Sequence, residues 1–168
     1  MNKLAQILGI QFPNEIEISS ITNTTDKVEE GSIFFALKGT QNHGSKYIEE
    51  AFEKGAKLAI HNDKNFCSSN ENIIYVKDLQ SSGGKKIFKV LEAFYKISNF
   101  NSHNYYAFTG TNGKTTSAYL CHQLLVKKGI SSIYIGTIGT QYNTNPLDQS
   151  ISKKTTPDIF ELFEIFNF

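Results

Sequence analysis

The spacing of apolar residues along the first half of the chain predicts four short strands. In the stretch EIEISSIT, isoleucines alternate with polar residues, which is typical of a strand with one buried face. The stretch SIFFAL is continuously apolar and follows the turn KVEEGS, as a fully buried strand would. Two further apolar runs, KLAIH and NIIYV, have the same length. The predicted strands cover residues 15–22, 32–37, 57–61 and 72–76.

Helical spacing appears between and after these strands. In SKYIEEAFEKGA, four apolar residues share one helical face, and Gly55 follows where a helix terminator is expected. A second helix is predicted at residues 85–98, where the apolar residues recur at the spacing of a core-facing stripe. The alternation indicates an α/β fold. The helical faces consist of Tyr47, Ile48, Ala51 and Phe52 in the first helix, and of Ile87, Val90, Leu91, Phe94 and Tyr95 in the second.

A polar linker, SNFNSHN, separates this region from the rest, so we place domains at 1–99 and 103–168. The second domain is expected to start with a strand in YYAFTG, residues 105–110. A later strand is predicted in SSIYIG, with a short continuation to Tyr142, and a last helix near residues 158–166. After residue 114, the sequence contains no apolar strand that ends in Asp or Glu, the residue that would complete a magnesium site at a strand end.

Composition narrows the class of protein. With 168 residues, 39% of them hydrophobic and 20% charged, the chain can bury the core of one domain, or of one domain and part of another. Seventeen basic and sixteen acidic residues leave a net charge of +1, which gives no support to nucleic-acid binding. No segment is apolar enough to span a membrane. Two cysteines without CxxC spacing and four scattered histidines predict no disulfide framework and no metal cluster. We expect a soluble cytoplasmic protein.

The candidate chemistry lies in GTNGKTT, residues 110–116, between the strand expected at 105–110 and a predicted helix. Glycines allow backbone N–H groups to surround phosphate oxygens, and the start of a helix adds unpaired N–H groups and a positive dipole end. Lys114 would place a charge on the terminal phosphates, and the Thr115 hydroxyl would bind magnesium. The helix is expected to bury a face formed by Ala118, Cys121, Leu124 and Leu125.

An ordinary glycine turn is the alternative interpretation of this loop. It explains neither the lysine nor the two threonines that follow it. The general nucleotide-loop pattern GxxxxGK[ST] would require glycine at position 108, where this chain has Phe108. The loop is therefore a shorter variant.

That variant, TGTNGKTT, resembles the ATP loop of the Mur ligases, the cytosolic enzymes that add amino acids to the UDP-muramoyl precursor of peptidoglycan. The related loop of folylpolyglutamate synthetases usually reads GTNGKGS, so Thr115 and Thr116 favour the cell-wall branch. YIGTIGT (residues 134–140), TTPDIFEL (155–162) and the stretch from Thr24 to Ile60 resemble the branch that adds the third residue of the peptide. The resemblance spans about Ile21 to Leu162.

The resemblance implies a small mixed α/β uridine-nucleotide domain followed by the start of a P-loop ATPase domain with a parallel sheet. It implies an ATP- and Mg²⁺-dependent amide ligase. A carboxylate of UDP-N-acetylmuramoyl-L-Ala-D-Glu would become an acyl phosphate, which the amine of diaminopimelate or lysine would attack. Lys114 and Thr115 would be catalytic, with Thr115 on magnesium. The implied ATP-binding residues are Gly110, Thr111, Asn112, Gly113, Lys114, Thr115 and Thr116, and the implied substrate-binding residues are Thr25, Thr40, Gln41, Asn42, Thr155 and Thr156.

Three of these stretches carry an alternative interpretation. The family's usual DSR segment reads TTD here, so Asp26 replaces an arginine that would favour a nucleotide. In TTPD, Thr156 as N-cap and Pro157 at the first helical position would make a good helix start without any ligand. One threonine could serve as both cap and contact. The stretch GTQNHGS is compatible with a surface loop.

The family's carbamylated lysine, its later magnesium ligand and its C-terminal domain have no counterpart in these 168 residues. The chain therefore looks like the first domain and the opening third or so of the second. Two function classes stay open: a ligase, truncated here or completed by a separate chain, and a binding module that recognises UDP-sugar or nucleotide without turnover. A generic P-loop kinase or ATPase is a third, but it does not explain the upstream stretches.

Overall fold

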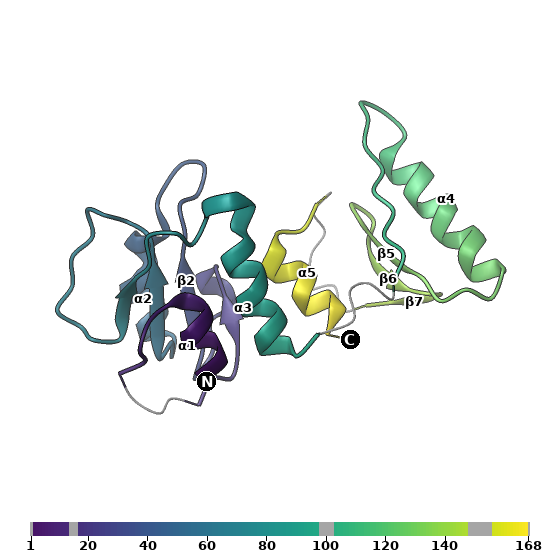
Figure 1. Cartoon of the computed structure of the whole chain (residues 1–168). Helices are drawn as coiled ribbons and strands as arrows, with labels where there is room; N and C mark the ends of the chain where they lie inside the picture. The colour runs from purple at the N-terminus through teal and green to yellow at the C-terminus, as the bar shows by residue number, and fades with distance from the viewer. Residues whose placement is uncertain (1, 14–16, 98–102, 148–155, 168) are drawn as a thin grey trace. The chain divides into compact units, whose positions relative to one another are not determined.

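The computed structural model describes residues 2–13, 17–97, 103–147 and 156–167 (Figure 1). The chain divides into two compact units, Met1–Lys96 and Ile97–Phe168. Each unit combines helices with a small sheet, which confirms the α/β class.

The first unit is built on a four-stranded parallel sheet in the order β1-β2-β3-β4. Three of the predicted strands are confirmed, each within one residue at either end. The apolar runs of β2 and β3 are fully buried, whereas β4 is half-buried and its last residue is exposed. The first predicted strand is much shorter than the sequence pattern predicts, since only two of its residues pair with β2. The strands are β1 (Ile21–Thr22), β2 (Ile33–Ala36), β3 (Leu58–His61) and β4 (Ile73–Tyr75).

Helices connect these strands and cover the sheet. The predicted stripe on α3 (Lys85–Tyr95) is confirmed for Ile87, Val90 and Leu91, which are buried. Its last two members, Phe94 and Tyr95, are half-buried, and the helix ends at Tyr95, before the predicted end at residue 98. α3 packs against α1 (Asn2–Leu8), a helix that the sequence reading did not predict. The other elements are η1 (Thr25–Lys27), η2 (Gly44–Tyr47), α2 (Ile48–Glu53) and η3 (Ser81–Gly84).

One core cluster joins the sheet to α2. Phe34 and Ala59 contribute side chains from β2 and β3, and Ile48 and Ala51 contribute side chains from the helix. Tyr47, which the helical spacing assigned to this face, is exposed instead, because it lies in the 3₁₀ turn before the helix begins. The core therefore fixes the carboxyl ends of β2 and β3 and the start of α2 relative to one another.

His61, the last residue of β3, is a buried titratable group in this unit. Only 3% of it is exposed, and its ring makes edge contacts with Phe66 and Tyr75. Burial lowers the pKa of His61; nearby His43 acts in the same direction and Asp63 opposes it. The folded state therefore favours the neutral ring.

We expect the free energy of unfolding to fall as the pH drops below about 6.5, where the histidine of the unfolded chain becomes protonated. The fall should level off below the lowered folded pKa of His61, and each unit of difference corresponds to about 1.4 kcal/mol. Urea unfolding at pH 7.5 and pH 5.5 measures this loss. His61→Phe should lose less stability over the same interval; an equal loss in both proteins would contradict the assignment to His61.

The second unit contains α4 (Lys114–Lys127), a three-stranded sheet and α5 (Ile159–Phe166). The strands β5 (Ile133–Gly136), β6 (Gly139–Tyr142) and β7 (Asn145–Pro146) form an antiparallel meander. This confirms the strand in SSIYIG and the last helix. The expected continuation to Tyr142 is instead a separate strand, β6, which follows a turn at residues 137–138 and pairs antiparallel with β5. Within the described part of this unit, the sheet is antiparallel throughout.

The prediction of a strand in YYAFTG is wrong. Residues 105–110 form no strand, and Tyr105 and Tyr106 are 57% and 65% exposed. Their aromatic and apolar composition suits a strand, but a parallel strand needs a partner on its edge. The described residues of this unit offer it none.

The face expected on α4 is buried only in part. Ala118, Cys121 and Leu125 are half-buried, but Leu124 is 63% exposed. The buried residue of this helix is His122. Its ring nitrogens hydrogen-bond to the Ser132 hydroxyl and the Asn143 carbonyl oxygen, both at 2.9 Å. These bonds tie α4 to the two ends of the β5–β6 hairpin, so a polar contact decides which side of the helix faces the sheet.

The start of α5 differs from the expected cap. Asp158, not Thr156, is the N-cap residue: its carboxylate accepts hydrogen bonds from the backbone N–H groups of Phe160 and Glu161. Glu161 accepts a hydrogen bond from the Asp158 N–H, which completes a capping box. Pro157 therefore precedes the helix. The interpretation of Thr156 as a helix cap is excluded.

Both cysteines are free thiols: Cys67 is exposed and Cys121 is half-buried. In the part of the chain that the structure describes, no group of three His, Cys, Asp or Glu side chains is placed to hold a metal ion. Among the same residues, no helix has the length and apolar character needed to cross a bilayer.

Candidate functional site

The loop GTNGKTT leads directly into α4. Gly113 is the N-cap position and has a left-handed backbone, φ 79°, a conformation that favours glycine. No side chain caps the helix there. The helical series of backbone hydrogen bonds begins with the Ser117 N–H, which donates to the Gly113 carbonyl oxygen at 2.8 Å. The N–H groups of the first helical turn therefore have no partner within the helix and can bind an anion.

Lys114 lies back across this loop. Its ammonium donates to the carbonyl oxygen of Gly110 at 2.6 Å and approaches that of Thr111 at 3.4 Å. The loop residues from Gly110 to Gly113 are exposed, and Lys114 is half-buried. A positive charge and unpaired backbone donors thus face the same small region, and this arrangement fits a phosphate group.

Thr115 makes a contact that the sequence reading missed. Its hydroxyl lies 2.9 Å from the hydroxyl of Thr137, which occupies the turn between β5 and β6. By sequence, the stretch YIGTIGT shows only a resemblance to the family. The fold shows that it forms the hairpin whose turn reaches the phosphate loop, and the spacing of 22 residues gave no sign of this.

We expect Thr137→Ala to weaken binding of Mg·ATP by the chain about threefold to tenfold. This corresponds to the ~1 kcal/mol of a single hydrogen bond that orients Thr115. Thr137→Ser keeps the hydroxyl and should bind nearly as well as the wild type. Isothermal titration of the three proteins measures the affinities, and equal weakening by serine and alanine would contradict a role for the hydroxyl.

The predicted nucleotide residues of the first unit follow the carboxyl ends of neighbouring parallel strands. Thr25 begins η1, after β1, and its side chain hydrogen-bonds to Glu50 on α2. The pKa of Glu50 is lowered by its bond to the Lys54 ammonium and, to a smaller extent, by the bond to Thr25. Thr25 is therefore engaged with α2 in this structure. The carboxyl edge is where open parallel sheets usually bind ligands.

Thr40, Gln41 and Asn42 form the tip of a loop that follows β2. Lys38 and His43 pair as an isolated antiparallel bridge at its base, and the Gly39 N–H donates to the Asn42 carbonyl oxygen at 2.9 Å. We call residues 38–43 the nucleotide loop. The three predicted residues are exposed at this edge.

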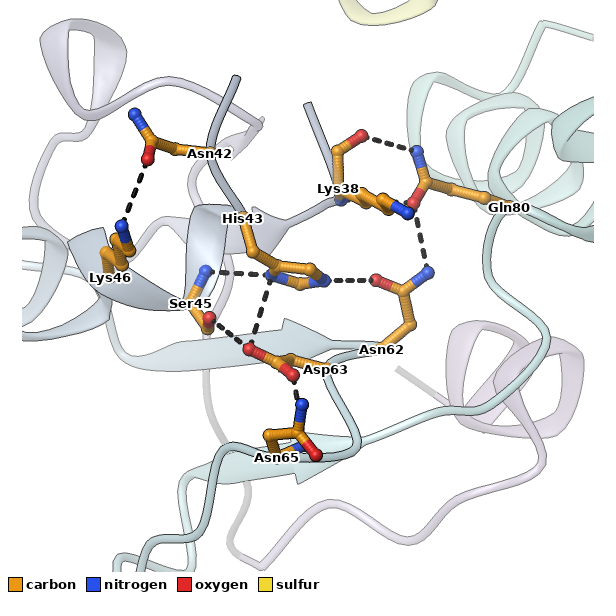
Figure 2. Close-up of polar contacts among 9 residues, drawn as sticks. All are labelled: Lys38, Asn42, His43, Ser45, Lys46, Asn62, Asp63, Asn65 and Gln80. Atoms are coloured by element: carbon orange, nitrogen blue, oxygen red, sulfur yellow. Dashed lines mark hydrogen bonds and ion pairs between the residues drawn. The ribbon is translucent and has the colours of Figure 1, made fainter. Parts of the chain in front are cut away.

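A cation stands beside this tip. The Lys46 ammonium donates to the Asn42 side-chain oxygen at 3.0 Å (Figure 2). The usual arginine of the family is replaced by Asp26, so Lys46 is a candidate for the positive charge that a diphosphate requires. The sequence reading did not single out Lys46, although it lies within GTQNHGSK and four residues after Asn42.

The last two predicted substrate residues lie before α5. Thr155 lies outside the described residues, and Thr156 is exposed in a bend two residues before the N-cap. The predicted ATP-binding residues, 110–116, lie at the loop before α4 and in its first turn, in the second unit. The predicted substrate residues 40–42 lie on a loop of the first unit.

Two family models match the chain in succession. The model described as "Mur ligase family, catalytic domain" matches residues 17–98, which contain the parallel sheet and the nucleotide loop. The model described as "Mur ligase middle domain" matches residues 108–167, from the phosphate loop through α5. The chain belongs to the Mur ligase family. The two matches divide this Mur ligase chain at nearly the place where it separates into compact units.

Curated relatives from several organisms carry two names, a diaminopimelate ligase and a tripeptide synthetase. The chain is 30% identical to the UDP-N-acetylmuramoyl-L-alanyl-D-glutamate--2,6-diaminopimelate ligase of Clostridium botulinum, which covers 99% of this chain. This chain is 36% identical, over 84% of its own length, to the protein of the same name from Aquifex aeolicus. It is 34% identical, over 94%, to UDP-N-acetylmuramyl-tripeptide synthetase 2 of Oceanobacillus iheyensis.

This Mur ligase chain spans about a third of the length of the curated relatives it matches, 34%, 27% and 30% in the same order. Solved structures agree on the fold. A diaminopimelate ligase of the same name superimposes with a TM-score of 0.63 at 22% identity, over 98% of this chain and 32% of that one. MurF from Acinetobacter baumannii gives a TM-score of 0.53 at 23% identity, over 75% and 27%.

Proposed function

We propose that this chain is part of a cytoplasmic ATP-dependent ligase that adds the third amino acid to UDP-N-acetylmuramoyl-L-Ala-D-Glu. The observation that carries the proposal is the phosphate loop at the start of α4, with Lys114 across it and Thr115 beside it. The names of the relatives support the choice of substrate. The proposed third amino acid is diaminopimelate or lysine.

Gly110 to Thr116 would hold ATP, and the Thr115 hydroxyl would be a ligand of Mg²⁺ together with phosphate oxygens. ATP supplies the phosphoryl group that activates the substrate carboxylate for amide formation. The residues fit this use: the helix start presents backbone donors, Lys114 presents a positive charge, and Thr137 orients the Thr115 hydroxyl. Such a site works by positioning and by electrostatic stabilisation.

The first unit, proposed as a domain of residues 1–99, would bind the uridine diphosphate of the substrate at the carboxyl edge of its sheet. Thr40, Gln41 and Asn42 would contact it, with Thr25 nearby along the same edge. Thr155 and Thr156, in the second domain of residues 103–168, would contact the muramoyl-peptide. Since Asp158 and Glu161 form the cap of α5, the Thr156 hydroxyl does not have that role.

A non-catalytic module that binds the UDP-sugar or the nucleotide is the second candidate. It is favoured by the exposure of the phosphate loop and by the lack, among the described residues, of an acidic cluster that could complete a magnesium site.

One experiment tests both candidates. The 168-residue chain is incubated with UDP-N-acetylmuramoyl-L-Ala-D-Glu, Mg·ATP and either diaminopimelate or lysine, and the tripeptide product is sought by mass spectrometry. A product that Lys114→Ala abolishes supports the ligase and overturns the module. Binding of the UDP-substrate in calorimetry without product is the result expected of a part of a ligase and of the module alike, and the absence of both product and binding overturns both candidates.

A further inference from the structure

A group of polar side chains at the carboxyl edge of the first unit's sheet has no role in the proposed chemistry. His43, Ser45, Asn62, Asp63 and Gln80 come from the nucleotide loop and η2, from the end of β3 and from the segment before η3 (Figure 2). All of them bond to one another or to the base of the nucleotide loop. We call these five residues the clamp.

Gln80 holds the first end of the nucleotide loop. Its side-chain oxygen accepts the Lys38 N–H at 3.0 Å, and its side-chain N–H donates to the Lys38 carbonyl oxygen at 3.1 Å. The amide thus pairs with both backbone groups of Lys38, as a neighbouring strand would. The same Gln80 oxygen accepts from the Asn62 amide at 3.0 Å.

His43 holds the second end. Because the Asn62 amide N–H donates to Gln80, its oxygen faces His43 Nε2 at 3.0 Å and must accept from it. The backbone N–H of Ser45 donates to His43 Nδ1 at 3.1 Å. Both contacts are satisfied by one form of the ring, neutral with its proton on Nε2.

Ser45 and Asp63 anchor the turn that follows. The buried Ser45 hydroxyl donates to one Asp63 carboxylate oxygen at 2.7 Å, and the Asn65 N–H donates to the other at 3.0 Å. These two bonds, the serine bond first, lower the pKa of Asp63. Asp63 is therefore held as a carboxylate by donors from the protein itself.

Backbone packing closes the same loop base. The Gly44 N–H donates to the Leu37 carbonyl oxygen at 2.8 Å. A Cβ at Gly44 would lie 2.9 Å from the Ala36 carbonyl carbon and 2.8 Å from the Leu37 nitrogen, both closer than real contacts allow. The chain therefore passes so close to the end of β2 that only glycine fits.

We propose that the clamp holds the nucleotide loop in the shape in which it receives a nucleoside diphosphate sugar, and that His43, Asn62 and Gln80 are positioning residues for that ligand. None of the three needs to touch the ligand. They fix both ends of a loop whose exposed tip consists of Thr40, Gln41 and Asn42, so the loop does not have to be ordered when the ligand binds. The proposal rests on the proposed function, because it takes the loop to be the uridine-diphosphate site.

A stability role alone would not explain this placement. His43 and Asp63 have side chains that are 19% and 22% exposed, and partly solvated hydrogen bonds contribute only about 0.5–1.5 kcal/mol each to folding. None of the five clamp residues belongs to the core cluster between α2 and the sheet, which contains Ala36 at the end of β2. The clamp bonds instead converge on the two ends of one exposed loop.

Two variants remove different hydrogen bonds of the clamp. Gln80→Met keeps the side-chain length and removes all three Gln80 bonds, whereas His43→Phe keeps a ring and removes both nitrogens. The matched control is Gln6→Met, at an exposed position on α1 in the same unit. Each protein is titrated with UDP-N-acetylmuramoyl-L-Ala-D-Glu by calorimetry, and amide exchange of Gly39 and Gly44 is followed by NMR without ligand.

We expect each clamp variant to raise the dissociation constant at least tenfold and to speed exchange of both amides at least tenfold, with the control unchanged. The double variant should bind about as weakly as either single variant, because both cut one network. If the wild type binds and Gln80→Met binds equally well, the positioning role is overturned and the proposed function stands. If the wild type does not bind, the uridine-diphosphate site itself fails, and the proposal falls with it.

Discussion

Replacing Lys114 by alanine should weaken binding of Mg·ATP to this chain about 100-fold, a loss of about 2.7 kcal/mol. The ammonium lies 2.6 Å from the Gly110 carbonyl oxygen, directly over the loop that presents the free N–H groups of α4. It is the one side-chain cation within GTNGKTT, and a charged hydrogen bond to a phosphate is stronger than one between neutral groups. Calorimetric titration with Mg·ATP measures the loss.

The control for this experiment is Lys127→Ala. Lys127 lies in the last turn of the same helix, so its removal changes the net charge equally but at the other end. Its affinity should stay within twofold of the wild type. If both variants lost affinity to the same extent, the effect would come from overall charge, and Lys114 would not be the phosphate-binding cation.

Replacing Phe34 by alanine should have the largest effect on stability, about 3–5 kcal/mol. Phe34 is 1% exposed and packs with Ile48, Ala51 and Ala59 in the core cluster. The other buried members of that cluster are Ile48 and four alanines, whose short side chains cannot fill the space that the ring leaves. A domain has a total stability of only about 5–15 kcal/mol, so the variant should unfold at much lower urea concentration.

Urea unfolding followed by far-ultraviolet circular dichroism gives this difference. Phe88→Ala makes the same chemical change on α3, at a position that is 37% exposed, and should cost less than about 1 kcal/mol. Equal losses in the two variants would mean that the cluster under α2 does not dominate the stability of the first unit.

Local patterns were enough to predict most elements of the first unit. The apolar runs at residues 33–36 and 58–61 are buried on both faces, so their composition alone indicates strands. The stripe of α3 and the phosphate loop were readable for the same reason, since each depends on residues close together in the sequence. The strand at residues 105–110 failed because a strand needs a partner, and its own residues cannot show whether one exists.

The candidate site was predictable in its residue types but not in its contacts. The glycines, Lys114 and Thr115 are consecutive, so the chemistry of a phosphate loop could be read from them. Thr137 comes from a hairpin turn 22 residues away, and its distance to Thr115 depends on how α4 packs against β5. His122 stabilises that packing through polar contacts, which an apolar pattern does not reveal.

By itself, the sequence determined the strands at residues 33–36, 58–61 and 73–75, the buried part of the α3 stripe and the residue types of the GTNGKTT loop, because hydrophobic periodicity and glycine-lysine chemistry act over a few neighbouring residues. That the strands pair in parallel followed only from the tertiary structure. Only the tertiary structure decided the α5 cap, the pairing of Thr115 with Thr137 and the clamp on the nucleotide loop. Lys38 and Gln80 are 42 residues apart, and His43 and Asn62 are 19 apart. Such directional hydrogen bonds form only after the parallel sheet has brought the ends of its strands to one edge.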